Sequence, residues 1–340
     1  MKILVDAFGG DNSPVDIIKG AIDAVNERDG FIVVLVGIEE VIKEELKKYK
    51  FDASRVEILP ASEVITCEEE PTVAIRKKPD SSLCVAFKAL KEDDEMKAFV
   101  SAGSTGAVLV GATLKLGRIK GVNRPALCPV LPTMDGDKKV LLMDCGANAD
   151  CKPINLVQFA LMGSAYAEAN GVENPRVALL SNGTEDEKGN MLIHEVLPLL
   201  KNLKGINFVG NIEGRDILNG KQDVVVCDGF SGNIALKSIE GAVSVVMKTL
   251  KEGIMASTSA KFGYLFMKKT FKQIRAKLEY HDKGGALFVG VNKPVIKAHG
   301  SSKAIAIKNT VFQAVDYAGF NISDKITEKL SLYKPEGEQV

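Results

Sequence analysis

Six short apolar runs, each typical of a buried strand, end directly in a loop of glycine with acidic, amide or hydroxyl residues. Glycine lets backbone N–H groups approach an anion closely, and a helix that follows the loop adds partial positive charge at its N-terminus. Phosphate is therefore the first ligand to expect. The six segments are KILVDAFGGD (2–11), AFVSAGSTGA (98–107), VLLMDCGAN (140–148), VALLSNGTEDEKGN (177–190), FVGNIEGRD (208–216) and VVVCDGFSGN (224–233).

These loops are expected to gather in one crevice. In an open parallel sheet the carboxyl ends of the strands share an edge, and such folds bind their ligands there. Three of the loops precede a helical segment and are the best candidates for holding phosphate: Ser104–Gly106, Gly183–Asn190 and Gly229–Asn233.

Strand-like runs alternate with segments of helical length and period, which predicts a mostly parallel sheet covered by helices on both faces. Helix starts are indicated by Ser13 before Pro14, by Pro71 opening the stretch 71–91 and by Ser301 at the head of 301–319. No linker-like segment interrupts the chain, so residues 1–340 are expected to form a single α/β/α domain. The expected strands are Ile3–Val5, Ile32–Val36, Val56–Leu59, Phe99–Ser101, Ala126–Leu131, Val140–Met143, Val177–Leu180, Asn207–Val209, Val224–Cys227 and Leu287–Val291.

A long helical stretch at 231–280 breaks this alternation and predicts a pair of helices that projects from the body. Projecting helices commonly pack on a second subunit, so a homodimer is expected. Residues 253–278 carry basic side chains and no acid, beside apolar residues at helical spacing, which suits an acidic partner or an anionic membrane. A dimer seam with a solvated basic face remains an equal alternative. The proposed docking residues are Lys268, Lys269, Lys272 and Arg275.

Composition narrows the class of protein. The chain has 340 residues, a formal net charge of zero and no Trp, so nothing in its overall charge or aromatic content favours nucleic acid. The six cysteines form no CxxC pair and have poor metal spacing, which indicates reduced packing residues in a cytoplasmic protein without a metal site. No cofactor is expected. No apolar run approaches the roughly 20 residues that span a bilayer, and the N-terminus begins as a strand without a signal segment.

Familiar nucleotide and hydrolase motifs are missing. The sequence contains no GxxxxGK[ST], no GxGxxG after a strand and no complete GxSxG. His194 lies in an apolar helical stretch and is expected to be structural, whereas His281 and His299 flank glycine-rich loops and are better functional candidates.

Seven ordered motifs, DAFGGD, SAGSTGA, DCGAN, SNGTEDEKGN, GNIEGRD, CDGFSGN and KAHGSS, resemble the bacterial phosphate acyltransferases of glycerolipid synthesis from residue 2 to about residue 310. The resemblance implies transfer of a fatty acyl chain from acyl carrier protein to inorganic phosphate, which gives an acyl-phosphate. It also implies a Rossmann-like α/β/α sandwich related to phosphotransacetylases and the isocitrate dehydrogenase group, and a homodimer peripherally associated with the membrane.

The resemblance places catalysis at Lys188 and Asn233, although Lys188 by itself reads as a solvated loop charge. Asp6 and Asp144 each follow a buried strand and are expected mainly to anchor loops, because a carboxylate repels phosphate. Pro60 stands where the family commonly has histidine, so no general acid is assigned there. The predicted substrate-binding residues are Asp6, Gly9, Gly10, Ser104, Thr105, Gly106, Asp144, Asn148, Asn182, Gly183, Thr184, Asp228, Ser231, Gly232 and His299.

Two other functions stay open. A short-chain phosphotransacetylase would use coenzyme A, but no adenine-recognition motif is evident and the basic, apolar helical stretch favours a protein carrier. A noncatalytic membrane-bound scaffold for lipid enzymes would have no use for six polar glycine loops at strand ends.

Overall fold

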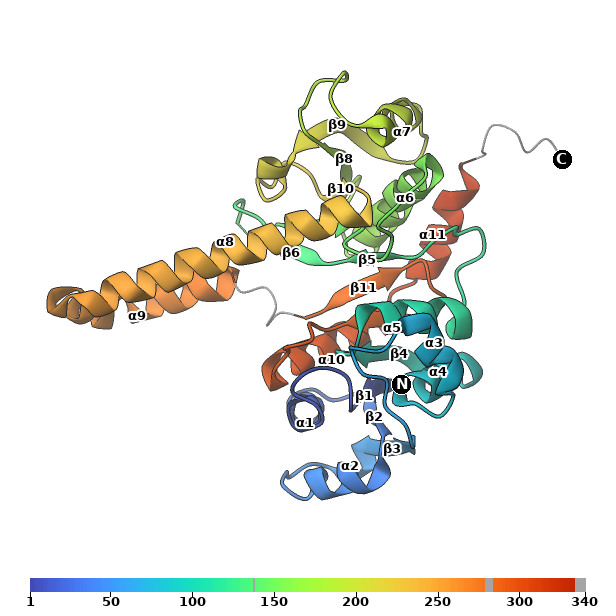
Figure 1. Cartoon of the computed structure of the whole chain (residues 1–340), viewed down its shortest axis with the longest axis vertical. Coiled ribbons are helices and arrows are strands. Elements are labelled where there is room, and N and C mark those ends of the chain that lie inside the picture. Colours follow the sequence, from blue (N-terminus) through green and yellow to red (C-terminus); the bar gives the residue numbers. More distant parts are fainter. Residues whose placement is uncertain (137, 279–283, 334–340) are drawn as a thin grey trace.

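Two β-sheets form the body of the protein in a computed structural model, which describes residues 1–136, 138–278 and 284–333, except the side chains of 275–278. Seven strands in the order β3-β2-β1-β4-β12-β11-β5 form the lower sheet in Figure 1, and five in the order β6-β7-β10-β8-β9 form the upper one. Neighbours are parallel except in the pairs β12–β11, β11–β5 and β6–β7. The predicted α/β fold with mostly parallel strands is confirmed, but its strands are divided between two sheets.

The strands are β1 (Lys2–Asp6), β2 (Ile32–Gly37), β3 (Val56–Pro60), β4 (Met96–Ser101), β5 (Ala126–Cys128), β6 (Val130–Pro132), β7 (Lys139–Met143), β8 (Arg176–Ser181), β9 (Asn207–Glu213), β10 (Val224–Val226), β11 (Ala286–Val289) and β12 (Val295–Lys297). The helices are α1 (Val15–Glu27), α2 (Glu39–Leu46), α3 (Pro71–Lys77), α4 (Ser82–Glu92), α5 (Thr105–Gly111), α6 (Pro153–Ala169), α7 (Met191–Lys201), α8 (Gly229–Ala256), α9 (Thr258–Leu278), α10 (Ala304–Gly319) and α11 (Ile322–Ser331). Short helical turns are η1 (Ala53–Arg55), η2 (Ala112–Leu116) and η3 (Gly214–Asp216).

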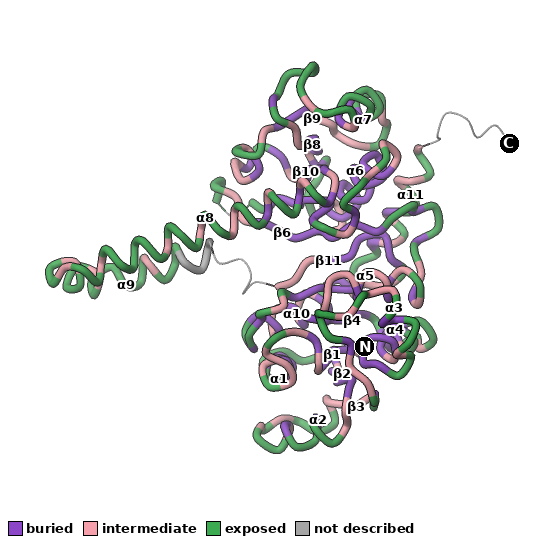
Figure 2. Tube along the Cα trace, in the orientation of Figure 1, coloured by how far each residue is buried: buried purple, intermediate pink, exposed green. Residues whose placement is uncertain are grey.

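Both sheets are apolar on both faces, because successive strand residues point to opposite sides. In β1, Ile3 and Val5 face the layer of α1 and α10, whereas Leu4 faces the layer of α4 and α5. In β8, Val177 faces α6 and Ala178 joins the cluster that includes Leu236 of α8. The buried segments in Figure 2 therefore run through the centre of each half.

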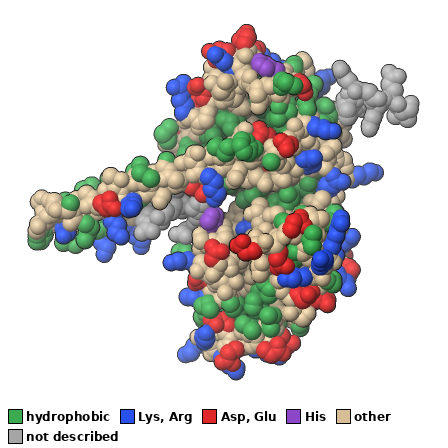
Figure 3. Space-filling model, viewed as in Figure 1, with side chains coloured by type: hydrophobic (Ala, Val, Ile, Leu, Met, Phe, Trp, Pro, Cys, Tyr) green, Lys and Arg blue, Asp and Glu red, His purple; other side chains and the backbone are tan. Residues whose placement is uncertain are grey.

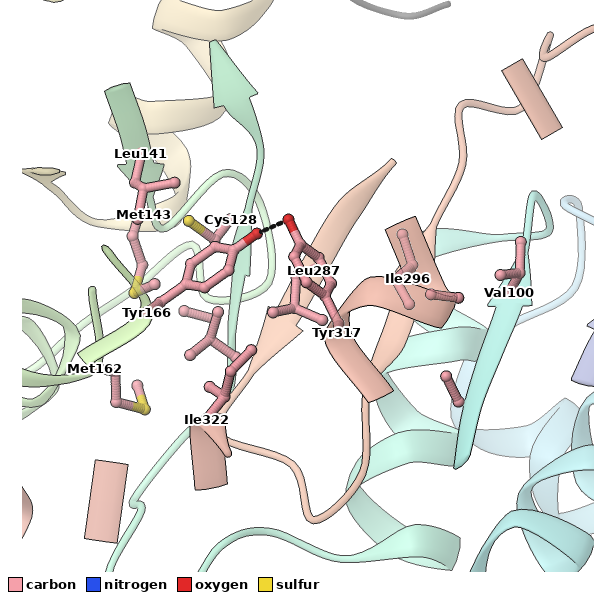
Figure 4. Close-up of a cluster of buried hydrophobic side chains, with 14 of the residues drawn as sticks. Val100, Cys128, Leu141, Met143, Met162, Tyr166, Leu287, Ile296, Tyr317 and Ile322 are labelled. Carbon is pink, nitrogen blue, oxygen red and sulfur yellow. Dashed lines mark hydrogen bonds between the residues drawn. The ribbon is translucent and has the colours of Figure 1, made fainter. Parts of the chain in front are cut away.

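The two halves meet through a continuous core. Tyr166 of α6 and Tyr317 of α10 pack edge to face, with ring centroids 5.5 Å apart, and their hydroxyl groups are hydrogen-bonded (Figure 4). Leu287 of β11 and Met143 of β7 belong to the same buried cluster, although they come from different sheets. Burial raises the pKa of the Tyr166 hydroxyl well above its usual range, so the pair stays neutral. That residues 1–340 form a single domain remains a prediction, which this shared core supports.

Prolines account for two differences from the predicted elements. The strand expected at Ala126–Leu131 is divided at Pro129, where the chain leaves β5 in one sheet and enters β6 in the other. Proline has no N–H for a ladder, so the break falls there. The helix expected at 71–91 is divided before Pro79, because a residue that precedes proline disfavours the helical conformation. The second part, α4, begins after its N-cap Ser81.

Other boundaries also differ. Strand β12 was not predicted, because a run of three residues that contains a lysine carries almost no pattern. Ser13 and Ser301 do not cap helices: the Ser13 hydroxyl donates to the Gly10 carbonyl over 2.7 Å, and α10 begins only at Ala304.

The predicted projecting helices are present as an arm formed by α8 and α9 (Figure 1). Most of its side chains are exposed, including Val245, Leu250 and Phe266 at 65%, 43% and 90%. Figure 3 shows hydrophobic side chains toward the free end of this arm and basic ones along one edge. The side chain of Arg275 lies outside the described residues. No helix among the described residues is long and apolar enough to cross a membrane.

Candidate active site

A crevice of about 1300 Å³ lies where loops from the two sheets face one another. The loops that follow β4 and β12 contribute Ser104, Thr105 and His299, and the other half contributes Gly146 after β7 and Asn233 in the first turns of α8. Four predicted site residues therefore share one cavity: Ser104, Thr105, Asn233 and His299. The single crevice expected along one sheet edge is instead a cleft between the loops of two sheets.

Asp6 fixes the loops on one side of the crevice from beneath. Its Oδ2 accepts a hydrogen bond of 2.7 Å from the Ser101 hydroxyl, whose oxygen in turn accepts from the Gly103 N–H at 3.0 Å. A Cβ on Gly9 would lie 2.5 Å from that same Oδ2, so only glycine fits between the two loops. Burial raises the pKa of the Asp6 carboxyl. Asp6 itself is buried at 1% exposure, which supports loop anchoring rather than phosphate contact.

Gly10, next to Gly9, adopts the left-handed conformation of a turn. Gly10 has a φ of +93°, and the Asp11 N–H donates to the Gly300 carbonyl over 2.9 Å. This contact joins the loop after β1 to the loop after β12. Gly106 lets α5 pack closely against α3, since a Cβ there would lie 2.7 Å from Pro71 of α3.

Asp144 has the same anchoring role on the other side. Its carboxylate accepts from the backbone N–H groups of Leu127, Ala147 and Asn148, at 2.9, 3.1 and 2.6 Å, and from the Asn148 side-chain amide. Burial raises the pKa of Asp144, while these donors act in the opposite direction. The Asn148 carbonyl then accepts from the Gly229 N–H at 2.8 Å and thereby positions the start of α8.

Asn233 is oriented by the cap of α8. Asp228 caps this helix through Oδ1, which accepts from the Ser231 N–H at 2.8 Å, and through Oδ2, which accepts from the Ser231 hydroxyl at 2.9 Å. Both carboxylate oxygens of Asp228 thus accept hydrogen bonds from Ser231. Gly232 lies against the Asp144 loop, and Asn233 is exposed and lines the crevice.

The loop with Lys188 lies outside the lining of this crevice. Lys188, Asn182 and Thr184 are exposed, and Gly183 is buried against the Lys188 stem. The loop borders a separate hollow of about 520 Å³ and is held by the Asn211 amide, which donates to the Glu185 carbonyl over 3.2 Å. It shares the carboxyl edge of its sheet with the loops after β7 and β10. The roles predicted for Asn182, Gly183, Thr184 and Lys188 stay predictions.

Lys297 was missed by the sequence reasoning. It ends β12, lines the crevice and is only 8% exposed, and burial lowers its pKa to about 8. The signal was a lysine inside the apolar run VIKA directly before His299. His299 is exposed and its Nδ1 lies 2.8 Å from the Ser301 hydroxyl, whereas His281 lies outside the described residues. His194, expected to be structural, is exposed on α7.

The cysteines give no support to a thiol nucleophile. Cys145 and Cys227 are 3% and 1% exposed, and burial raises the pKa of both thiols well above the usual range. A reactive thiol needs the opposite shift. Cys67 is exposed and lines the crevice. Within the described part of the chain, no group of three or more His, Cys, Asp or Glu side chains could hold a metal ion.

Comparisons with known proteins show the family to which the chain belongs. A sequence model described as "Fatty acid synthesis protein" matches residues 1–325. Phosphate acyltransferase from Clostridium novyi (strain NT) is 48% identical over 327 residues, which cover 96% of this chain and 97% of that protein. Phosphate acyltransferase from Acetivibrio thermocellus is 47% identical over 330 residues, 97% of this chain and 96% of that protein.

Solved structures agree on the fold. A phosphotransacetylase from Streptococcus pyogenes has a TM-score of 0.61 at 18% identity and covers 96% of this chain and 94% of its own. A branched-chain phosphotransacylase from Enterococcus faecalis has a TM-score of 0.58 at 14% identity, covering 94% of this chain and 100% of its own. The fold is thus the one seen in phosphotransacetylases. The chain itself belongs to the fatty acid synthesis protein family that contains these phosphate acyltransferases, and it is an enzyme of the transferase class.

Proposed function

We propose that this enzyme transfers a fatty acyl group from the thioester of acyl carrier protein to inorganic phosphate. The observation that carries the proposal is the crevice itself, in which hydroxyl, amide and cationic side chains of Ser104, Asn233 and Lys297 line one cavity. These groups can hold a phosphate and can donate to an oxyanion. Membership in a family with phosphate acyltransferases supports the same reaction.

The reaction needs positioning more than activation. A phosphate oxygen attacks the carbonyl carbon of the thioester, and a tetrahedral oxyanion forms. The carbon–sulfur bond then breaks and releases the carrier thiolate. The proton that hydrogen phosphate loses on becoming the acyl-phosphate balances the proton that the thiolate takes up through solvent. Phosphate is already a competent nucleophile, so the main tasks are to align it and to stabilise the oxyanion. We assign Asn233 and Lys188 to donate to that oxyanion. Asp6, Asp144 and Asp228 hold the surrounding loops without touching phosphate.

A direct assay tests this reaction. The purified chain is incubated with a long-chain acyl-carrier protein, and free carrier thiol and acyl-phosphate are measured with phosphate or with sulfate in its place. We expect both products to appear in equal amounts and only with phosphate. Phosphate-dependent release of thiol from acyl-coenzyme A alone would favour a phosphotransacetylase. If phosphate released thiol from neither donor, the noncatalytic scaffold would be the remaining function.

The arm of α8 and α9 is proposed to receive the acidic carrier protein. Lys268, Lys269 and Lys272 are exposed on α9, and residues 253–278 contain no acid while the whole chain is neutral. Exposed charges of one sign accelerate encounter with an oppositely charged partner, and salt screens them.

Charge reversal on the arm is expected to affect one substrate only. The double variant Lys268→Glu and Lys272→Glu should raise the KM for the carrier-bound donor roughly tenfold and leave the KM for phosphate unchanged, because rim charges act on encounter. The matched control reverses Lys88 and Lys91, which are exposed on α4. An unchanged donor KM, together with binding that does not respond to ionic strength, would place the carrier elsewhere.

The apolar side chains of the arm are proposed to bury against a second copy of the chain and against a lipid surface. Val245, Val246 and Leu250 of α8 are 65%, 52% and 43% exposed in the single chain, which suits a dimer seam. Phe262 and Phe266, at 63% and 90%, lie near the free end and suit a bilayer. We expect light scattering to give the mass of a dimer, and the mass of a single chain would contradict the dimer assignment.

We expect Phe266→Asp to abolish flotation of the protein with anionic vesicles. Unchanged flotation of this variant would contradict the lipid assignment.

A further inference from the structure

Lys297 is a buried cation that has no anionic partner among the residues that the structure describes. Its ammonium group donates to the backbone carbonyls of Ala102 and Ala298, at 3.2 and 2.5 Å. Among the described residues no carboxylate lies within ion-pair distance of it, and the nearby Asp6 is occupied by Ser101 and Phe8. A charge is costly to bury unless it is paired, so an anion bound in the crevice would stabilise this ammonium group.

The ammonium group of Lys297 has one donor left for a ligand in the crevice. An ammonium group has three N–H donors, and the two carbonyls account for two of them. Lys297 lines the cavity together with Gly103, Ser104 and His299, so the third donor is available to a ligand there. The two carbonyls belong to the loops after β4 and β12, which hold the ammonium in place at the crevice wall.

We propose that Lys297 binds the phosphate group that reacts, through a direct hydrogen bond from its ammonium group to a phosphate oxygen. The inference rests on the proposed function and assigns the acceptor to the side of the crevice formed by β4 and β12. The opposite side, with Asn233 at the start of α8, then faces the thioester. Lys297 thus binds and orients the nucleophile, and it is distinct from Lys188, which is assigned to the oxyanion.

The small side chains around Lys297 favour a compact anion. Ala102, Gly103 and Ser104 form the neighbouring loop, and Gly300 follows His299. A phosphate group could come from free inorganic phosphate or from the phosphodiester of the carrier's prosthetic arm. The experiment separates these two sources because each has its own Michaelis constant.

Lys297→Met is the main test, and Lys293→Met is a closely matched control. Lys293 precedes the opposite end of β12 and also donates to two backbone carbonyls, those of Asp93 and Met96 at 3.1 and 3.2 Å, but it does not line the crevice. We expect Lys297→Met to raise the KM for phosphate, and its dissociation constant by calorimetry, roughly 10- to 100-fold, the scale of a lost hydrogen bond to a charged group. The KM for the acyl donor should change less than about twofold, and Lys293→Met should change neither.

A second measurement uses the protein without removing this lysine. Because burial lowers the pKa of Lys297 to about 8, its charge is lost as the pH rises through that value, and phosphate binding should weaken roughly tenfold between about pH 8 and about pH 9.5. The charged or titratable groups around it are Asp6 of β1, Asp11 before α1, Cys67 before α3, Lys237 of α8 and, in its own loop, His299. A Cys67→Ser background removes the thiol from the titration.

Several results would overturn the inference. These are wild-type phosphate affinity in folded Lys297→Met, pH-independent phosphate affinity in the Cys67→Ser protein, or a rise in the donor KM alone, which would place the carrier's phosphodiester at Lys297. Calorimetry with inorganic phosphate does not depend on turnover. Lys297-dependent binding without acyl transfer would therefore refute only the proposed function, and normal transfer by Lys297→Met would refute only the inference.

Discussion

Replacing Lys188 by alanine is expected to lower turnover by roughly 100- to 1,000-fold, the scale of a lost oxyanion-hole donor. In the described part of the chain the Lys188 ammonium makes no hydrogen bond or ion pair, so it is available to a substrate. Its loop is nevertheless held in place, because the Asn211 amide binds the Glu185 carbonyl and Asn190 caps α7 through the Ile193 N–H at 3.0 Å. A positioned loop with an unpaired cation can act on a transition state.

Lys204→Ala is the control for this change. Lys204 is also exposed, but it lies before β9, at the opposite edge of the same sheet. Initial rates at saturating phosphate and donor should drop only for Lys188→Ala, while thermal unfolding of both variants stays as in the unmodified chain. Turnover close to normal in folded Lys188→Ala would remove this lysine from the mechanism and leave Asn233 as the assigned donor.

Gly232→Ala is expected to lower the free energy of unfolding by about 3 kcal/mol, the upper end of the usual cost of overpacking, and to abolish most activity. A Cβ at this position would lie 1.9 Å from the Asp144 carbonyl oxygen and 2.7 Å from the Cys227 sulfur. Neither neighbour can yield easily, because the Asp144 loop is fixed by its backbone hydrogen bonds and Cys227 is buried. The first turn of α8 would have to move, and Asn233 would move with it.

Gly241 in the same helix provides the comparison. Apart from its chain neighbours and its own helical backbone, no described atom lies within 4 Å of a Cβ built there. Gly241→Ala should therefore raise the free energy of unfolding by up to about 1 kcal/mol through helix propensity. Urea unfolding and the acyl-transfer rate are measured for both variants. Equal stability of the two alanine variants would mean that the close approach at Gly232 does not constrain the site.

Much of the fold could be predicted from local pattern. The runs around Ile3, Val33 and Val177 are apolar at every position, which is typical of strands buried on both faces, and the structure places them so. The division into two sheets could not be predicted, because a strand's sequence shows that it is buried and not which neighbour it joins. Pro129 marks the crossing point, yet its meaning depends on where β11 and β7 lie.

The features of the site also fall into those that local sequence predicts and those that depend on the tertiary structure. The sequence by itself determined the loop chemistry, because glycines and acidic residues follow the apolar runs of the predicted strands. The contacts of these residues are long-range. The Asp6 carboxylate accepts from the Ser101 hydroxyl, and a Cβ on Gly232 would lie 1.9 Å from the Asp144 carbonyl oxygen. Only the tertiary structure decided which loops share the crevice and which side chain becomes a buried cation. Lys297 is an ordinary lysine in sequence, and it acquires its lowered pKa only because β12 is placed between β4 and β11 with its end at the crevice wall.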